Sequence, residues 1–186
     1  MKIIKDSEFI RGNIPMTKEE IRTLTMSKMH LKKDDFILDI GGGTGAMAIS
    51  LAANVPKGSV VTIEKNEEAY GLIHRNKEKF NANNLNIIHG MAPDHLPRKK
   101  FDKVFVGGTY GKMTEIFIYL NEFLKKDGII ILNFITLENI GKAIELLKKY
   151  KYDYEITQVT ISKSSLIKDL TLMKTNNTVT IIKGKR

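Results

Sequence analysis

The stretch from Phe36 to Gly45 constrains the fold of this chain more than any other part. It reads FILDIGGGTG, an apolar run that ends in Asp39 and is followed by four glycines and one threonine within residues 41–45. The apolar run predicts a short buried strand, and residues 46–53 predict the start of a helix. A strand, a tight glycine turn and a helix N-terminus form a cradle for a nucleotide-like ligand, because glycine adopts positive φ and lets a ligand approach the backbone.

Two ligand classes fit this cradle. Residues 41–46 match the dinucleotide fingerprint G-x-G-x-x-G/A. Asp39, together with the tighter G-x-G-x-G spacing of residues 41–45, resembles motif I of the class I S-adenosylmethionine methyltransferases. The acid can face the cationic amino group of that methyl donor, a charge that a dinucleotide lacks. Glu64, at the end of the next predicted strand, is placed to accept hydrogen bonds from ribose hydroxyls in either case. The glycine loop favours the methyl donor over the dinucleotide and over a purely structural turn.

The composition predicts one compact domain over residues 1–186, since 42% of the residues are hydrophobic. The chain has no cysteine, which excludes disulfides, thiolate nucleophiles and cysteine metal sites. Its four histidines show no close helical pairing, so we expect no metal site. The N-terminus has no apolar signal core and no apolar run reaches bilayer length, so we expect no membrane partner and a cytoplasmic protein.

The formal net charge of +9 at pH 7 indicates an anionic partner. Nucleic acid is one candidate, and a polyanionic small substrate is another, because a positive field raises the association rate of any anion. Lysines on solvated helix faces account for the charge equally well. No long uninterrupted basic block is present, which makes nucleic acid the weaker partner hypothesis.

Strand and helix patterns alternate along the chain and predict a parallel sheet with helices on both faces. Strands are expected near residues 35–40, 59–64, 85–89, 102–107 and 128–135, and helices near 44–53, 66–81, 112–126 and 138–149. Residues 152–162 and 178–183 then predict two successive strands joined by a polar connection, which is typical of an antiparallel pair. About 33 residues precede the first core strand as an N-terminal lid segment. Within it, residues 17–20 match a capping box that opens a helix ending near His30.

Five further segments resemble the precorrin methyltransferases of the cobalamin pathway, in particular the decarboxylating branch that acts at carbon 15 of a cobalt-precorrin. They are DSEFIR at residues 6–11, GNIPMTKEEIR at 12–22, HGMAPD at 89–94, VFVGG at 104–108 and NTVTII at 177–182. The resemblance covers nearly the whole chain. The segment at residues 12–22 is its most specific part, whereas the glycine motif is shared by many enzymes.

The resemblance implies a Rossmann-like, seven-stranded class I methyltransferase sheet of the α/β class with a reversed C-terminal strand. It implies S-adenosylmethionine as methyl donor and an anionic tetrapyrrole as acceptor. The implied reaction methylates carbon 15 of cobalt-precorrin-6B and removes carbon dioxide from the ring C acetate, giving cobalt-precorrin-7 in anaerobic cobalamin biosynthesis. It also implies a homotetramer. The implied donor-binding residues are Thr17, Gly41, Gly42, Gly43, Thr44, Gly45, Glu64, Met91 and Ala92.

Several assignments stay open at this point. Met91 stands where the family usually has an acid, which puts a side-chain bond to the adenine in doubt and leaves the backbone of Ala92 for that role. Thr17 can cap its helix, contact the donor, or do both. No catalytic acid or base is readable. An RNA methyltransferase and a donor-binding module without this activity are the alternative functions.

Basic side chains outside the core strands are candidates for binding the substrate's carboxylates. These candidates are Arg11, Lys18, Arg22, Lys163, Lys168 and Lys174. A solvated surface charge is the simpler explanation for each of them singly. As a set beside the ligand edge of the sheet, they form a hypothesis that a structure can test.

Overall fold

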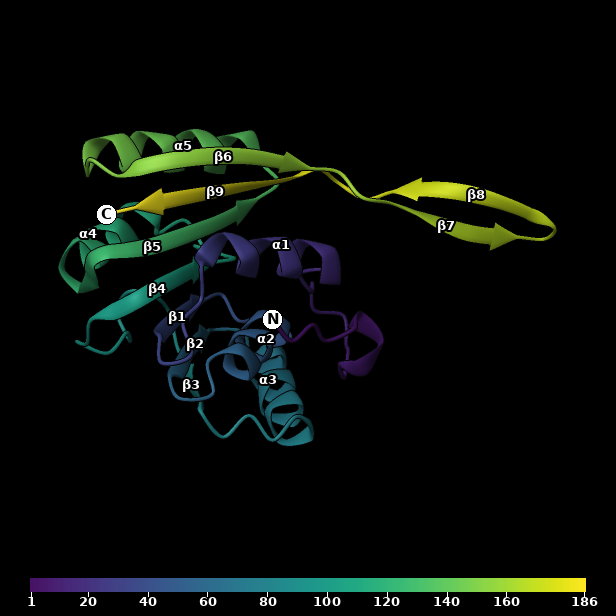
Figure 1. Ribbon diagram of the computed structural model, residues 1–186, viewed down its shortest axis with the longest axis horizontal. Coiled ribbons are helices and arrows are strands. Elements are labelled where there is room, and N and C mark those ends of the chain that lie inside the picture. Colours follow the sequence, from purple (N-terminus) through teal and green to yellow (C-terminus); the bar gives the residue numbers. More distant parts are fainter.

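Seven strands form one sheet in the computed structural model, which describes residues 1–186 (Figure 1). Their order across the sheet is β3-β2-β1-β4-β5-β9-β6. Strands β1 to β5 pair in parallel, and β9 runs antiparallel to both of its neighbours. The strands are β1 (Phe36–Ile40), β2 (Ser59–Glu64), β3 (Leu85–His89), β4 (Phe101–Val106), β5 (Leu124–Phe134), β6 (Asp153–Val159) and β9 (Val179–Lys185).

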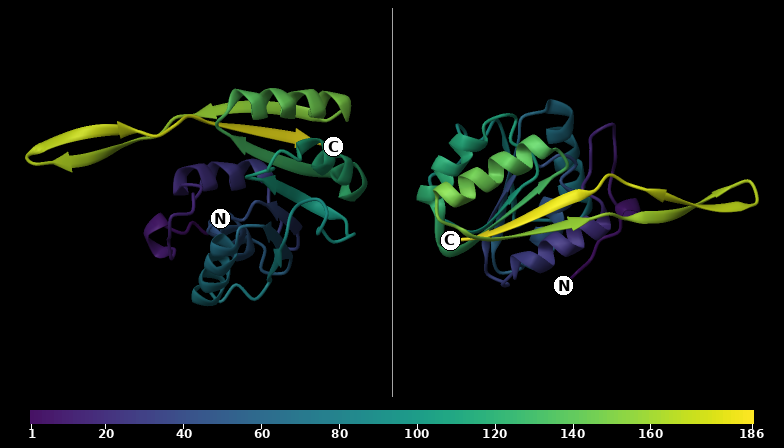
Figure 2. Two further views of the ribbon diagram at one scale, coloured as in Figure 1. Left: turned by 180° about the vertical axis from the view of Figure 1, so that it is seen from behind. Right: turned by 90° about the horizontal axis from the view of Figure 1, so that it is seen from above.

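Helices cover both faces of this sheet (Figures 1 and 2). One face carries α1 (Glu19–Met29), α2 (Ala46–Asn54) and α3 (Glu67–Lys79), and the other carries α4 (Met113–Phe123) and α5 (Leu137–Lys149). A short 3₁₀ helix, η1 (Asp6–Glu8), lies in the segment before α1. No helix in the structure combines the length and apolar character needed to cross a bilayer.

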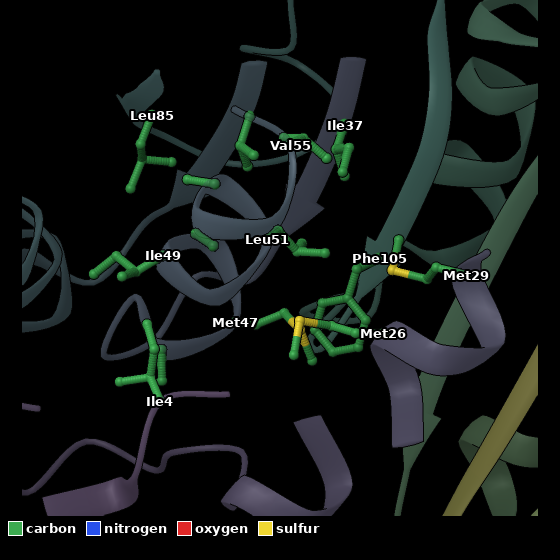
Figure 3. Packing of buried hydrophobic residues seen from close by; sticks show 14 of the residues in the cluster. Ile4, Met26, Met29, Ile37, Met47, Ile49, Leu51, Val55, Leu85 and Phe105 are labelled. Carbon is green, nitrogen blue, oxygen red and sulfur yellow. The ribbon is translucent and has the colours of Figure 1, made fainter. Parts of the chain in front are cut away.

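The core consists of two clusters of buried residues, one on each face of the sheet. Central strands such as β1 are buried on both faces, as expected for parallel strands covered by helices. Figure 3 shows Met26, Met29 and Met47 around Phe105 of β4 in the cluster beneath α1 and α2. Thioethers fill irregular gaps of this kind well, and the methionines serve packing here.

The connection between β6 and β9 is itself a hairpin, which the sequence analysis described only as a polar connection. It consists of β7 (Ser162–Ile167) and β8 (Leu170–Thr175), which form a separate two-stranded sheet. The hairpin projects away from the body of the molecule (Figures 1 and 2). The predicted antiparallel pair is nevertheless present, because β6 and β9 pair along their whole length.

The predicted α/β class, the seven-stranded sheet and the reversed last strand are thus confirmed. The parallel order places the carboxyl ends of β1, β2, β4 and β5 at one edge of the sheet. In open α/β sheets this edge is where ligands bind, so it is the place to search for a site.

Candidate functional site

One cavity of about 580 Å³ opens at this edge. That volume is typical of pockets for small organic ligands. Its walls come from the carboxyl ends of the four strands, from the N-terminal segment before α1 and from the base of the projecting hairpin. Six of the predicted site residues line it, namely Thr17, Gly41, Gly42, Gly43, Thr44 and Glu64.

The glycine loop between β1 and α2 has a backbone that only glycine accommodates readily. Gly41 has φ +84°, and a Cβ there would lie 2.8 Å from the backbone nitrogen of Gly108 in the loop after β4. Gly43 has φ +55°, and a Cβ there would lie 3.1 Å from the carbonyl oxygen of Pro15. The loop is therefore packed between two other segments, with little room for any side chain.

Glu64 is the polar centre of the site. It is buried at the end of β2, and its carboxylate accepts four hydrogen bonds. Oε2 accepts from the Gly43 amide at 2.9 Å, and Oε1 accepts from the amides of Lys65 and Asn66 at 2.8 and 2.9 Å. The hydroxyl of Tyr110 donates the fourth bond, also to Oε1, at 2.9 Å. Glu64 thus fixes the glycine loop relative to β2.

Asp39 does not face the cavity, contrary to the expectation that it meets a cationic ligand group. Its side chain points beneath the loop, where it is fully buried and accepts a hydrogen bond from the Thr62 hydroxyl at 2.8 Å. Its Oδ1 has no hydrogen-bond partner. The reason is the alternation of the strand, which sends residue 39 to the same face as Thr62 while the glycine loop covers both. Burial, with a smaller contribution from the nearby Glu64, raises the pKa of Asp39 to about 7 although the Thr62 bond lowers it.

This pKa predicts an unusual pH dependence of stability. An acid with a higher pKa in the folded chain than in the unfolded chain stabilises the fold while it stays protonated. That contribution is lost as the pH rises from about 4, where the unfolded chain releases the proton, to about 7, where the folded chain does. Between pH 5 and pH 7 the wild type should lose about 2–3 kcal/mol of unfolding free energy relative to Asp39→Asn. Urea unfolding at both pH values measures the difference, and the exposed Asp34→Asn is the matched control. The prediction would be contradicted if the unfolding free energies of the wild type and Asp39→Asn differed by the same amount at both pH values.

The predicted capping box at Thr17 is wrong. Helix α1 begins at Glu19 with Lys18 as its N-cap, and no side chain caps it. The first helical bond runs from the Arg22 amide to the Lys18 carbonyl, while the Thr17 carbonyl accepts from the Arg22 guanidinium at 2.5 Å. Thr17 therefore belongs to the extended segment that lines the cavity, and of its two proposed roles only the ligand contact remains.

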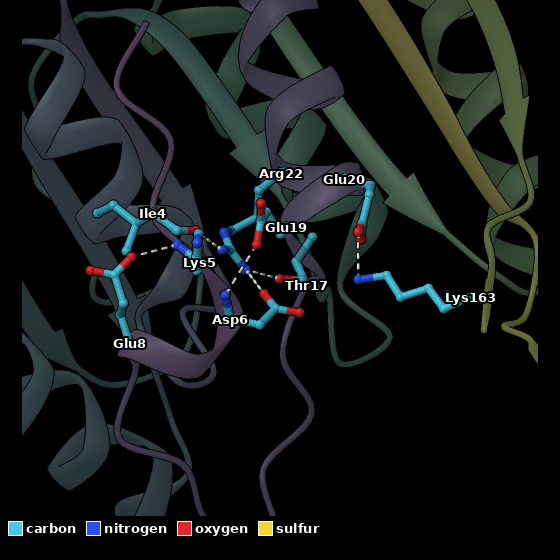
Figure 4. Close-up of polar contacts among 9 residues, drawn as sticks. All are labelled: Ile4, Lys5, Asp6, Glu8, Thr17, Glu19, Glu20, Arg22 and Lys163. Atoms are coloured by element: carbon cyan, nitrogen blue, oxygen red, sulfur yellow. Dashed lines mark hydrogen bonds and ion pairs between the residues drawn. The ribbon is translucent and has the colours of Figure 1, made fainter. Parts of the chain in front are cut away.

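Arg22 is structural and does not reach the cavity. Its side chain is 1% exposed and forms an ion pair with Asp6 at 2.6 Å. It also donates to the Ile4 carbonyl at 2.6 Å, and its guanidinium lies over the ring of Phe9. Figure 4 shows the contacts of Arg22 with Asp6, Ile4 and Thr17, which tie the N-terminal segment to α1. The hypothesis that Arg22 pairs with a substrate carboxylate is thereby corrected.

The other basic candidates lie outside the cavity as well, with one exception. Lys163 pairs with Glu20 of α1, and this contact lowers the pKa of Glu20 and raises that of Lys163 (Figure 4). Lys168 and Lys174 lie on the projecting hairpin, away from the cavity lining. Lys18 alone among the six candidates lines the cavity.

Three other predicted donor residues lie beside the main cavity. Gly45 is the N-cap of α2 with φ +81°, where a Cβ would meet Ile73 at 3.2–3.4 Å. Met91 and Ala92 line a second, very small cavity of about 10 Å³. Tyr110 and Gly41 border both cavities.

The structure adds residues that the sequence analysis did not single out. Asn133, at the end of β5, lines the cavity, and its Nδ2 donates to the Thr25 hydroxyl at 2.9 Å while its buried Oδ1 has no partner. Asn76 of α3 is fully buried and bridges two segments by bonding both the amide and the carbonyl of Ile10 and the carbonyl of Thr44. The position of Asn133 at a strand end was a usable signal, whereas nothing in the sequence marked Asn76.

Comparisons with known proteins agree with this geometry. A family model described as a precorrin methyltransferase domain matches residues 8–186. A relative from Saccharolobus solfataricus, named "Probable cobalt-precorrin-6B C(15)-methyltransferase (decarboxylating)", is 41% identical over 98% of this chain and 95% of its own. The crystal structure of a precorrin-6y C5,15-methyltransferase from Geobacter metallireducens superposes with a TM-score of 0.93 at 33% identity, over 98% and 96% of the two chains. A precorrin-8W decarboxylase from Methanobacterium thermoautotrophicum gives 0.92 at 32% identity, over 98% and 99%.

Proposed function

Because the chain belongs to the precorrin methyltransferase family, we propose that it methylates carbon 15 of cobalt-precorrin-6B and removes carbon dioxide from the ring C acetate. The product is cobalt-precorrin-7, and the step belongs to anaerobic cobalamin biosynthesis. The observation that carries the proposal is the 41% identity, over nearly the full length of both chains, to a relative named for this reaction. The proposal treats residues 1–186 as one catalytic domain with residues 1–33 as its lid.

The residues of the cavity fit S-adenosylmethionine as the methyl donor. Residues 41–44 line the cavity, and Gly41 and Gly43 present only backbone with positive φ there, which suits close approach by a ligand. Glu64 ends β2 with a carboxylate suited to ribose hydroxyls, and Thr17, in the segment before α1, also lines the cavity and carries a hydroxyl. Met91 and Ala92 are assigned to the adenine. The proposed donor residues are Thr17, Gly41, Gly42, Gly43, Thr44, Gly45, Glu64, Met91 and Ala92.

The remaining wall of the cavity suits an anionic, largely flat acceptor. Amide side chains line it, with Ile14 and Ile135 among the apolar surfaces and Lys18 as a cation; the amides are Asn133, Asn139, Asn176 and Asn177. The asparagine amides and the Lys18 ammonium donate hydrogen bonds to carboxylates. The net charge of +9 attracts the polycarboxylate to the protein. The proposal names no nucleic-acid or membrane partner, and it places the reaction in the cytoplasm.

The chain contributes to the reaction by positioning the methyl donor and the acceptor relative to each other. When bound, S-adenosylmethionine would supply an electrophilic methyl group on a sulfonium sulfur. Carbon 15 of the acceptor provides the electron pair for the new bond, and the pair of the broken carbon–sulfur bond leaves with S-adenosylhomocysteine. The glycine loop and Glu64 hold one reactant while the amide-lined wall orients the other, and alignment of this kind can supply several kcal/mol of the barrier reduction. When the acetate loses carbon dioxide, the electron pair of the broken bond passes into the conjugated macrocycle, so no side chain has to take it up. We assign no catalytic acid or base.

The projecting hairpin supports the further proposal that the protein assembles as a homotetramer. Leu166, Leu170 and Met173 on β7 and β8 are 74, 67 and 65% exposed, which is unusual for apolar side chains gathered on one element. Hairpins of several copies could cover one another. Light scattering that gives the molar mass of four chains would support the tetramer, and the mass of one chain would reject it.

The reaction has a direct test. Incubation of the protein with S-adenosylmethionine and cobalt-precorrin-6B should give a product whose mass reflects one methyl group gained and one carbon dioxide lost. A product that has gained the methyl group but kept every carboxylate would reject decarboxylation and retain methyl transfer. Methylation of bulk tRNA with none of the tetrapyrrole would favour the RNA methyltransferase alternative. Donor binding without methyl transfer to the tetrapyrrole or to tRNA would support the alternative of a donor-binding module.

A further inference from the structure

Tyr110 stands apart from the other contacts of Glu64. Three of the four hydrogen bonds to the Glu64 carboxylate come from backbone amides, which the fold holds in place. The fourth comes from the Tyr110 hydroxyl, a side-chain donor from the turn between β4 and α4. A carboxylate offers about four acceptor positions, so these four bonds saturate Glu64. Among its four partners, only the Tyr110 hydroxyl can leave without moving the glycine loop or the end of β2.

Tyr110 also borders the small cavity beside Met91 and Ala92. Gly41, Gly108 and Tyr110 border both this cavity and the large one, and of the three only Tyr110 has a side chain. The small cavity measures about 10 Å³, which is about the space of one water molecule and far too little for a purine ring. A nucleoside that reaches from Glu64 to Ala92 would therefore meet the Tyr110 side chain where the two cavities adjoin.

The backbone at Tyr110 is held in a conformation that this residue type disfavours. Its φ is +48°, and the next residue, Gly111, has φ +83°. Positive φ is uncommon outside glycine and is unfavourable for a bulky side chain such as tyrosine. The side chain is half exposed, and its ring lies under the Lys65 ammonium at 3.8 Å. Burial of the hydroxyl and its bond to Glu64 raise the pKa of Tyr110 to about 12. The Tyr110 side chain is thus held by one hydrogen bond, to Glu64, and by one cation–π contact, with Lys65.

We propose that Tyr110 occupies the donor's nucleoside site in the donor-free protein and that a ribose hydroxyl replaces its hydroxyl on Glu64 when the donor binds. This inference rests on the proposed donor. The exchange keeps the number of hydrogen bonds at Glu64 constant, because one hydroxyl donor replaces another. Tyr110 therefore lowers the affinity for the donor by competition, and its outward movement opens the space beside Met91 and Ala92.

The test compares Tyr110→Phe with the wild type in calorimetric titration with S-adenosylhomocysteine. Phenylalanine keeps the ring but cannot donate a hydrogen bond to Glu64. The dissociation constant of the variant for S-adenosylhomocysteine should therefore be roughly three- to tenfold lower, as expected for removal of one competing hydrogen bond. Tyr154→Phe, on β6 and outside both cavities, is the matched control and should bind as the wild type does. Unchanged or weaker binding by Tyr110→Phe would overturn the competition and leave the donor assignment standing.

A second measurement follows the side chain itself. In protein with ¹³C-labelled tyrosine rings, the Tyr110 resonance, assigned by its absence in Tyr110→Phe, should shift when S-adenosylhomocysteine saturates the wild type. The resonance of Tyr154 should stay in place. A Tyr110 resonance that does not respond at saturation would overturn the displacement. If neither protein binds the ligand, the proposed donor and this inference fall together.

Discussion

Replacement of Gly43 by valine should abolish donor binding. Gly43 has φ +55°, where a β-branched residue is strongly disfavoured, and a Cβ there lies 3.1 Å from the Pro15 carbonyl oxygen. Valine would push the glycine loop and the N-terminal segment apart and displace the amide that Glu64 holds. We expect S-adenosylmethionine to bind at least ~100-fold more weakly in calorimetric titration, since both walls of its site would move.

Two further variants separate this effect from general damage to the fold. Gly43→Ala keeps the unfavourable φ without the branched side chain and should show an intermediate loss of affinity. Gly71→Ala, in α3, has nothing within 4 Å of its new Cβ and should bind the donor as the wild type does. Wild-type affinity in folded Gly43→Val would show that the glycine loop is not the donor site.

The sequence predicted the sheet well because its central strands are short apolar runs that only a covered parallel sheet can bury. The glycine loop and Glu64 were predictable for a related reason. Each follows or ends one of those strands, and the carboxyl ends of parallel strands meet at one edge. Gly41, Gly42, Gly43, Thr44 and Glu64 accordingly line one cavity, which Thr17 joins from the segment before α1.

The errors concern contacts that a local sequence pattern does not specify. Thr17 carries a capping pattern, but its carbonyl accepts from the Arg22 guanidinium. The helix begins at Glu19, one residue later than the pattern predicts. Lys163 is one of many surface lysines in the sequence, and only the fold places it beside Glu20. Local patterns carry no information on such pairings.

Tyr110 illustrates the same limit at the site itself. Its segment follows β4, whose carboxyl end lies at the ligand edge of the sheet. Its bond to Glu64, however, joins residues 46 positions apart, and its positive φ depends on the turn that it forms. Neither the hydrogen bond nor the positive φ can be predicted from the amino-acid sequence alone.

Replacement of Arg22 by methionine should cost about 3 kcal/mol of unfolding free energy, the lower end of the range for removing one member of a buried ion pair, because the Asp6 side chain is 21% exposed. The methionine would fill much of the space but leave the Asp6 carboxylate and the carbonyls of Ile4 and Thr17 without their donor. Urea unfolding measures the loss. Arg11→Met removes the same charge from an exposed position and is the matched control.

Removal of the Arg22 guanidinium should also affect the donor site. Arg22 binds the carbonyl of Thr17, which lines the cavity, and thereby helps to hold the N-terminal segment. Pro15 of that segment lies against Gly43. Donor affinity should therefore fall in Arg22→Met at temperatures well below its unfolding transition, by more than the unfolded fraction explains. Arg22→Lys keeps the charge but lacks the forked geometry that reaches three acceptors, so its stability and affinity should both be intermediate. Wild-type donor affinity in folded Arg22→Met would mean that Arg22 stabilises the fold without positioning the lid. Wild-type stability in the same variant would contradict the buried ion pair itself.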